Sequence, residues 1–427
     1  MKTNNVNNIS FTNSCNIGLG LRTASKICSI QEGGAGLSNI RFIQDSATGL
    51  LPKAVFARSK ADLGENIFLE LSESILVYYC PAILGEKFFR KIFSKKLPNN
   101  LKKSLSTPAS ELLKSGNITN NKKIIPVKAA IALGAFAIPL VEFSLNYIKN
   151  LMTLKVFKQS NFDSIANLNK NKTENKKQAE YVENSARRNI SRAGFVYAFC
   201  LALAGILFSS GEKSKALQNL SELIVAPGTK LFKRNEKLKN FFNKFLSIDF
   251  ANDNGKLSMS RGQLTSCVLV GGAGYFGASK DRGKQNFLET VFRYPVVGFY
   301  IIYGNELLEK GFRKLLYKTG RCKEVLNDRL EVPRFDQLRE YSEKFCGRSD
   351  ELYKKMLKQK ILIAGVPLLF GIGFMGFFIA GTSNLFTKFR YNREQNKYSK
   401  VNMAYRVKNP VQFQSQSIQN VRYNNIS

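Results

Sequence analysis

The segment Ile361–Thr387, ILIAGVPLLFGIGFMGFFIAGTSNLFT, contains no charged side chain and lies between Lys360 and Lys388. A helix needs about 20 apolar residues to cross the hydrocarbon core of a bilayer. This segment reaches that length even without its polar end from Thr382 onward, and it therefore predicts a transmembrane helix. We interpret the rest of the chain around it, because it assigns the protein to a membrane but indicates no function.

Two more apolar segments extend this prediction. Residues Ala193–Gly211, AGFVYAFCLALAGILFSSG, are uncharged and long enough to span. Residues Ile124–Ile148 are also apolar but include Lys128 and Glu142. Ionisable groups inside a membrane are costly and often functional, so these two residues are candidate intramembrane functional residues. The alternative, which we favour, is that each lies near a helix end and extends toward the membrane surface.

A glycine pattern lies in segment 262–279, a marginal spanning candidate. Gly272, Gly274 and Gly277 have the G-x-G-x-x-G order of a dinucleotide-binding loop. That loop needs a strand before the glycines and a helix packed on a sheet after them, and the following ASKDRGKQN has no apolar face for such a helix. We therefore interpret the segment as a glycine-rich membrane helix, in which small residues let neighbouring helices approach closely. A nucleotide-binding enzyme is the weakest alternative.

The composition excludes several kinds of catalytic and metal site. The chain has no His, which excludes a Ser-His-Asp triad and any His-ligated metal. Its 7 Cys are widely spaced, without a C-x-x-C pair, and so indicate neither a zinc site nor a disulfide framework. We expect no cofactor and a non-enzymatic role.

The formal net charge of +34 suits anionic lipid or nucleic acid. Much of this charge reflects a general richness in Lys and Asn, and the membrane segments favour anionic lipid, so nucleic acid is not an expected partner. Segments EKFFRKIF at Glu86–Phe93 and EKGFRKLL at Glu309–Leu316 predict basic amphipathic helices at the membrane surface, and residues 229–246 have a similar pattern. The alternative is that their Phe faces pack on protein. The candidate lipid-surface residues are Lys87, Arg90, Lys91, Lys310, Arg313 and Lys314.

Short sequence matches recur in the same order and predict an internal duplication. The matches are FARSK with FGASK, GENIFLE with GKQNFLE, EKFFRKIF with EKGFRKLL, and NLMT at 150–153 with NLFT at 384–387. Each match is short, and the prediction depends on their common order. If all three apolar segments between the two FLE copies span the membrane, the second unit is inverted; if only two span, the units are parallel.

Together these patterns predict a mostly α-helical, multi-pass integral membrane protein with about three to five transmembrane helices. The expected regions are a disordered segment (1–41), a first repeat (42–153) with membrane segment 124–148, basic connectors (154–261) around membrane helix 193–211, a second repeat (262–387) with segments 262–279 and 361–387, and a disordered basic tail (388–427). We expect a plasma or inner membrane location without a cleavable signal peptide. Transport or lipid handling is the more specific functional hypothesis, and a scaffolding protein that binds anionic lipid is the alternative.

Overall fold

The structure is a computed structural model that describes residues 18–29, 49–79, 88–169, 175–253, 256–258, 260–346 and 350–408. The described residues form an all-α fold apart from one short antiparallel hairpin, β1 (Ala251–Asp253) with β2 (Lys256–Ser258), in which Asn252 is opposite Leu257.

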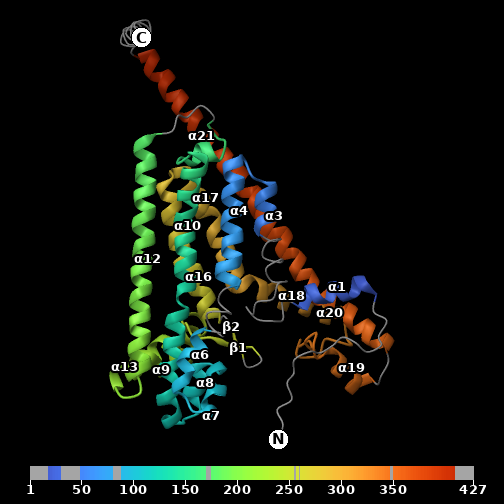
Figure 1. Ribbon diagram of the computed structural model, residues 1–427. Helices are drawn as coiled ribbons and strands as arrows, with labels where there is room; N and C mark the ends of the chain where they lie inside the picture. Colours follow the sequence, from blue (N-terminus) through green and yellow to red (C-terminus); the bar gives the residue numbers. More distant parts are fainter. Residues whose placement is uncertain are drawn as a thin grey trace.

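Long helical runs that lie side by side form the body of the molecule (Figure 1). These runs are α4 (Lys60–Glu73) with the π-helix η3 (Ser74–Tyr79), α9 (Ile118–Ala135) with α10 (Ala137–Phe157), α12 (Lys176–Ser210), α16 (Arg261–Asp281), α17 (Lys284–Phe299) with the π-helix η7 (Tyr300–Gly304), and α20 (Asp350–Phe370) with the π-helix η8 (Gly371–Phe378) and α21 (Ile379–Lys408).

Shorter elements occupy the ends and one side of this bundle (Figure 1). At the end shown lowest are α6 (Arg90–Phe93), η5 (Ser94–Lys96), α7 (Asn99–Lys102), η6 (Lys103–Ser106), α8 (Ala109–Lys114), α13 (Lys215–Val225), α14 (Pro227–Leu231), α15 (Glu236–Phe245) and the hairpin. The remaining elements are α1 (Leu19–Cys28), α3 (Leu51–Val55), α11 (Phe162–Ile165), α18 (Asn305–Lys318) and α19 (Leu338–Cys346).

The run α9–α10 is the central helix of the bundle. Every residue from Ile124 to Ala135 is buried, as expected for a helix that is apolar on all sides. The neighbours of this run include α4, α12, α13 and α16. Its two parts meet at Phe136, where the helical hydrogen bonds are interrupted.

Among the described residues, three helical runs are long and apolar enough to cross a membrane: Ile118–Phe157, Lys176–Ser210 and Asp350–Lys400. They contain the three apolar segments identified in the sequence. The most apolar part of the first run is mostly buried within the bundle, whereas the most apolar parts of the other two are mostly exposed. On α12, for example, Phe195 is 76% exposed and Phe199 62% exposed.

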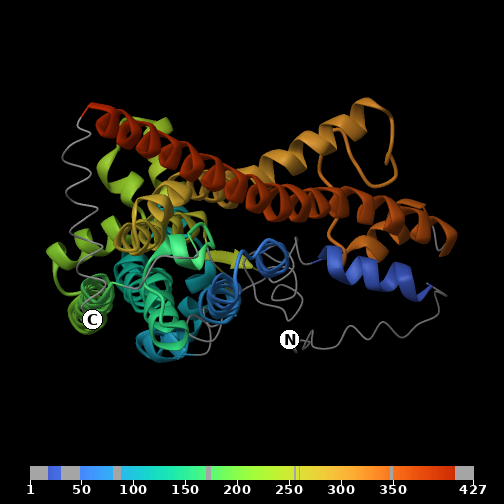
Figure 2. The same ribbon diagram turned by 90° about the horizontal axis from the view of Figure 1, so that it is seen from above.

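Two segments predicted to be disordered contain helix. Helix α1 lies against α20, where the Cys28 thiol contacts the Ile361 carbonyl at 3.9 Å (Figure 2). Helix α21 continues to Lys408, so the first part of the predicted disordered tail is helical. This continuation is rich in Lys and Arg, which are good helix formers. The rest of both predicted segments lies outside the described residues.

The directions of the helices follow from their contacts. Arg282, just before α17, binds Glu65 near the start of α4, so both helices begin at the same end of the bundle. The side chain of Phe157, at the end of α10, lies against Gly64, so α10 runs opposite to α4. Thr387 of α21 similarly binds Glu289 of α17, near the end where α17 begins. Helix α4 therefore runs in the same direction as α17, and α10 in the same direction as α21. The choice between inverted and parallel units counted only the three apolar segments between the two FLE copies. In the described structure α4 and α17, which contain those copies, also run along the bundle.

Candidate functional site

Two short segments of equal length begin α4 and α17. The first is RSKADLGE, from Arg58 to Glu65, and the second is RGKQNFLE, from Arg282 to Glu289. In each, the residue after the arginine is the N-cap of the helix. The cap of α17 is Gly283, whose φ of 115° is a conformation that side chains with a Cβ rarely adopt.

Each arginine binds the glutamate of the other segment. Arg282 donates from Nη1 to Glu65 Oε2 at 3.0 Å and from Nη2 to Glu65 Oε1. Arg58 donates from Nη1 to Glu289 Oε2 at 2.8 Å and from Nη2 to Glu289 Oε1 at 3.3 Å. Two parallel charge-assisted hydrogen bonds make each contact strong and geometrically specific.

A threonine completes each contact. Thr153 Oγ1 donates to Glu65 Oε1 at 2.6 Å, and Thr387 Oγ1 donates to Glu289 Oε2 at 2.7 Å. These threonines end the recurring sequences NLMT and NLFT. We call the six residues the reciprocal clamp: Arg58, Glu65, Thr153, Arg282, Glu289 and Thr387.

The asparagines of NLMT and NLFT connect the same helices. Asn150 Nδ2 donates to the carbonyl of Ala278 at 2.9 Å, and Asn384 Nδ2 donates to the carbonyl of Phe56 at 2.8 Å. Both carbonyls lie shortly before an arginine of the clamp. Arg282 is 1% exposed and Glu65 is 5% exposed. A buried charge is tolerated when it is paired and hydrogen-bonded, so the clamp is a satisfied structural connection.

A second group of ionisable residues, farther along the same helices, is not paired in this way. We call it the inner charge cluster, and it consists of Glu73 on α4, Glu142 and Lys149 on α10, and Arg293 on α17. All four are partly buried. The charge of Glu73 interacts most with that of Lys53, which pairs with Glu70, and also with those of the other three members. Within the described part of the chain, the side chains of the four members make no hydrogen bond or ion pair; Lys149 Nζ lies 5.2 Å from the ring centroid of Tyr275.

The structure separates the two predicted intramembrane residues. Lys128 is 2% exposed, forms an ion pair with Asp249 at 3.0 Å and donates to the carbonyl of Leu105 at 2.7 Å. It therefore holds α9 against the segment that follows α15. Glu142 instead lies against Gly271 and belongs to the inner charge cluster.

The predicted lipid-surface residues have mixed environments. Lys87 lies outside the described residues; Lys91, Lys310 and Lys314 are exposed, Arg90 and Arg313 are partly buried, and Arg313 pairs with Glu309. In α6 and the residues just before it, the alternative interpretation holds in part: Phe93 packs on Phe208 and Phe89 lies against Gly134, whereas Phe88 is 52% exposed.

The glycine-rich segment is the interior of α16, so no strand delivers the glycines to a loop. A Cβ added at Gly274 would lie 2.5 Å from the backbone oxygen of Phe143 on α10. One added at Gly277 would lie 2.2 Å from Tyr147 Oη. The glycines therefore permit close packing of α16 on α10, as small residues do between neighbouring helices. Helix α16 is not among the helices of the described residues that are long and apolar enough to cross a membrane.

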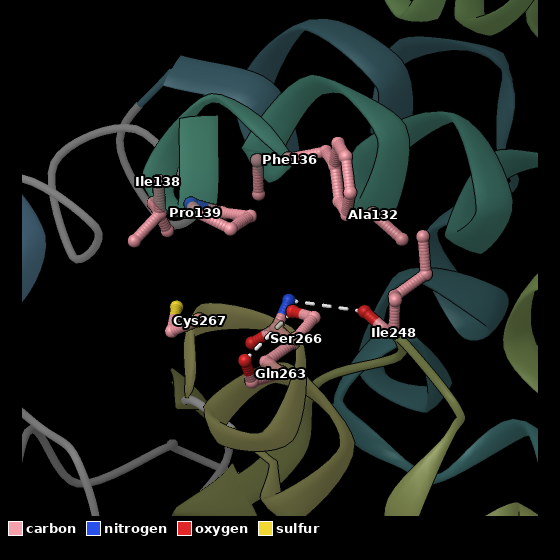
Figure 3. Close-up of a pocket in the computed structure, with 9 residues that line it drawn as sticks. Ala132, Phe136, Ile138, Pro139, Ile248, Gln263, Ser266 and Cys267 are labelled. Atoms are coloured by element: carbon pink, nitrogen blue, oxygen red, sulfur yellow. Dashed lines mark hydrogen bonds between the residues drawn. The ribbon is translucent and has the colours of Figure 1, made fainter. Parts of the chain in front are cut away.

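A small cavity lies between the α9–α10 break and the start of α16 (Figure 3). Its volume is about 10 Å³, and apolar residues such as Phe136 and Pro139 face Gln263 across it. Gln263 Nε2 donates to the carbonyl of Ile248 at 3.0 Å, whereas its Oε1 is buried and has no hydrogen-bond partner among the described residues. The volume suits a single water and no larger ligand. Among the described residues, no group of three or more acidic or Cys side chains is placed to hold a metal.

Sequence reasoning missed the reciprocal clamp because it aligned FLE with FLE, which pairs Glu70 with Glu289. The structure instead gives Glu65 and Glu289 equivalent places, and Glu70 pairs with Lys53. The signal that could have revealed this register is the shared spacing of Arg, Lys and Glu in RSKADLGE and RGKQNFLE.

Comparisons of the chain with protein-family models, curated proteins and solved structures find no match.

Proposed function

We propose that the chain is a multi-pass membrane protein of two parallel repeats that transports a charged solute and catalyses no reaction. The three membrane-length helices support the membrane location. The exposed faces of two of them carry large apolar side chains, including Phe199, Leu369 and Leu385. Many exposed large apolar side chains on membrane-length helices are consistent with contact with lipid or with a partner.

The order of elements supports the duplication. In each proposed repeat an arginine precedes a helix that continues as a π-helix, as in α4–η3 and α17–η7. A basic segment follows, and a long helix then carries NLMT or NLFT. The reciprocal clamp connects the two repeats through equivalent residues. Parallel repeats are found in some transporter families, whose substrate sites lie at the repeat interface.

The observation that carries the transport proposal is the inner charge cluster. The first repeat contributes Glu73, Glu142 and Lys149, and the second contributes Arg293. Ionisable residues in the interior of a membrane bundle are costly, and they commonly mark a substrate or ion pathway. A charged solute would supply the partners that these side chains lack within the described structure.

Charge movement in proteoliposomes on a solid-supported membrane tests this proposal. We would apply gradients of protons, amino acids, carboxylates, phosphate and nucleotides, and expect a transient current above protein-free liposomes for at least one. Glu73→Gln and Lys149→Met should each abolish that current in protein that remains monodisperse. Glu183→Gln with Arg187→Gln removes an exposed ion pair on α12 and should leave the current unchanged. No current with any of these solutes, or unchanged currents in the cluster variants, would contradict the proposal.

A membrane scaffold that binds anionic lipid is the second candidate. It is supported by α15, where Leu238 and Phe241 are 40% and 47% exposed among several lysines. A scaffold should reshape vesicles that contain anionic lipid without moving charge across them. Electron microscopy of the same proteoliposomes tests this, and tubulated vesicles without solute-driven current would favour the scaffold over the transporter.

A further inference from the structure

The carboxylate of Glu142 lies in the contact between α10 and α16. A Cβ added at Gly271 of α16 would collide with this carboxylate, so the glycine makes room for it between the two helices. Farther along, Asn150 Nδ2 of α10 donates to the carbonyl of Ala278 of α16 at 2.9 Å. The two contacts follow the same order in both helices, and α10 and α16 therefore run side by side in the same direction.

The small cavity of Figure 3 is next to Glu142 along this contact. Pro139 of α10 and Cys267 of α16 line the cavity. They come three and four residues before Glu142 and Gly271. Residues at these spacings lie on the same side of a helix, about one turn apart. The cavity and the carboxylate are therefore neighbours, and this placement depends only on packing contacts.

The cavity has the polar groups that a single water molecule needs. Gln263 is 6% exposed, and its buried Oε1 accepts no hydrogen bond from the part of the chain that the structure describes. Ser266 Oγ donates to the backbone carbonyl of Gln263 at 2.7 Å and can still accept a hydrogen bond. Cys267 adds a thiol. A buried water typically makes about three hydrogen bonds, and a volume of about 10 Å³ admits water but no larger solute.

Polar side chains continue from Glu142 toward the other end of α10. Asn146, Lys149 and Thr153 follow it at spacings of four, seven and eleven residues, which places them on one side of the helix. Asn146 is 1% exposed, and its Oδ1 is buried without a hydrogen-bond partner among the described residues. Thr153 binds Glu65 of the reciprocal clamp. A polar stripe, Glu142 to Thr153, thus leads from the cavity to the end of the bundle where α10 ends.

We infer that the transported solute is the proton, and that Glu142 carries it between the cavity water and the polar stripe of α10. Acidic side chains inside membrane bundles commonly form proton relays. On binding, an O–H bond of hydronium breaks as a carboxyl O–H bond forms, and release to water reverses this exchange. The inference rests on the proposed transport function and names its solute.

Other titratable groups face Glu142 from the neighbouring helices. They are Glu73 on α4, Cys267 on α16 and Tyr294 on α17. Tyr294 donates its hydroxyl proton to the carbonyl of Val268 at 2.8 Å, so this proton is engaged. A carboxyl at position 142 can therefore be tested by substitutions that leave these neighbours in place.

Proton flux into proteoliposomes that contain a pH-sensitive dye tests the inference, with potassium and valinomycin to balance charge. We expect a pH gradient to acidify vesicles with the parent protein faster than protein-free vesicles. Glu142→Gln should reduce the rate to that of protein-free vesicles, whereas Glu142→Asp, which keeps a carboxyl, should retain flux. The matched control is Glu180→Gln, an exposed carboxylate on α12, which should leave the rate unchanged. Flux that survives Glu142→Gln would overturn the assignment.

Dicyclohexylcarbodiimide gives a test that needs no substitution. This apolar reagent attacks protonated carboxyl groups, so it should modify Glu142 in the full-length parent protein and stop the flux. Mass spectrometry locates the adduct. Flux that continues after Glu142 has been modified would overturn the inference, as would a Glu142 that the reagent does not modify.

Gln263→Met tests the cavity water, because Met has a similar volume but no oxygen to accept a hydrogen bond. We expect slower flux than in the parent. Gln263→Glu should restore it, since a protonated Glu can donate to the Ile248 carbonyl and still accept from the water. Equal flux in Gln263→Met and the parent would overturn delivery through this water.

The solute-driven currents separate this inference from the proposed function. A current driven by an amino acid, carboxylate, phosphate or nucleotide gradient, without proton flux, would overturn the inference and leave transport standing. The absence of both current and proton flux would overturn both.

Discussion

At the residue scale, Lys128 places a buried ammonium group on the central helix. This group contacts two other segments of the chain. Asp249 Oδ1 lies 3.0 Å from Lys128 Nζ, and the other carboxylate oxygen accepts from the N–H of Ala109 at 2.7 Å. Burial raises the pKa of Asp249, while Lys128 and backbone N–H groups act in the opposite direction. Each member of the pair therefore makes burial of the other possible.

We predict that Lys128→Met destabilises the protein by about 3–5 kcal/mol, because it leaves a buried carboxylate without its cation. The measurement is the loss of monodisperse protein on heating in detergent. Lys128→Met with Asp249→Asn should recover part of the loss, since no charge then remains buried. A single variant as stable as the parent would contradict the structural role of Lys128.

The sequence indicates which ionisable residues lie in apolar segments, but not which residues they meet. Lys128 and Glu142 could be singled out because their neighbours in the chain are apolar. Asp249 could not, since it lies in a polar connector far along the sequence. The same limit hid the inner charge cluster: Glu73 and Arg293 lie in helices with too many charges to satisfy a hydropathy criterion.

At the scale of elements, α16 packs on α10 through glycines. Gly274→Ala should destabilise the protein, because the new Cβ would meet the rigid backbone of Phe143. The matched control is Gly194→Ala on α12, where nothing in the described structure outside the local helix backbone lies within 4 Å of an added Cβ. That change should stabilise the helix by roughly 1 kcal/mol through helix propensity. Thermal denaturation compares the two variants; equal effects would show that α16 and α10 are not in close contact.

The reciprocal clamp connects α4 with α17, and its two halves differ in burial. The Arg282 side chain is 1% exposed and the Arg58 side chain 16% exposed. Arg282→Met should therefore destabilise the protein by about 3–5 kcal/mol, as expected for a buried pair that loses one partner, and Arg58→Met by less. Thermal denaturation of both variants shows which of the two substitutions destabilises the protein more.

The control for the clamp is Arg187→Met, which removes an exposed ion pair on α12 and should change stability by at most about 1 kcal/mol. The opposite order, with Arg58→Met more damaging than Arg282→Met, would show that burial does not determine the strength of the two halves.

The sequence predicts that the long elements are helices, but it does not predict where these helices begin and end. The apolar runs at Ala193 and Ile361 predict helices, and the structure has α12 and the run α20–α21 there. Helix α12 begins much earlier, at Lys176, because the preceding residues are good helix formers that hydropathy does not detect. Hydropathy reports which part of a helix suits a membrane, and local propensity determines where the helix ends.

At the scale of the whole molecule, the relative direction of the two proposed repeats depends on α4 and α17. Neither is apolar enough to count as a spanning helix from its sequence, so the count of crossings, and hence the direction of the second unit, could not be derived. The clamp explains how both helices lie within the bundle, because it pairs Arg58 with Glu289 and Arg282 with Glu65. Residues far apart in the sequence thus determine the topology.

This arrangement predicts which residues face the same side of a membrane. Lys60 and Lys284, at the starts of α4 and α17, should lie on one side, and Lys103 and Lys215, at the other end of the bundle, on the opposite side (Figure 1). Single cysteines at these positions, labelled in sealed vesicles with a membrane-impermeant maleimide, give the measurement, with the unmodified chain as background. Inverted repeats would place positions 60 and 284 on opposite sides, and a bundle that does not span would expose all four positions to one side. Of these three arrangements, only parallel repeats that span the membrane would have positions 60 and 284 labelled from one side and positions 103 and 215 labelled from the other.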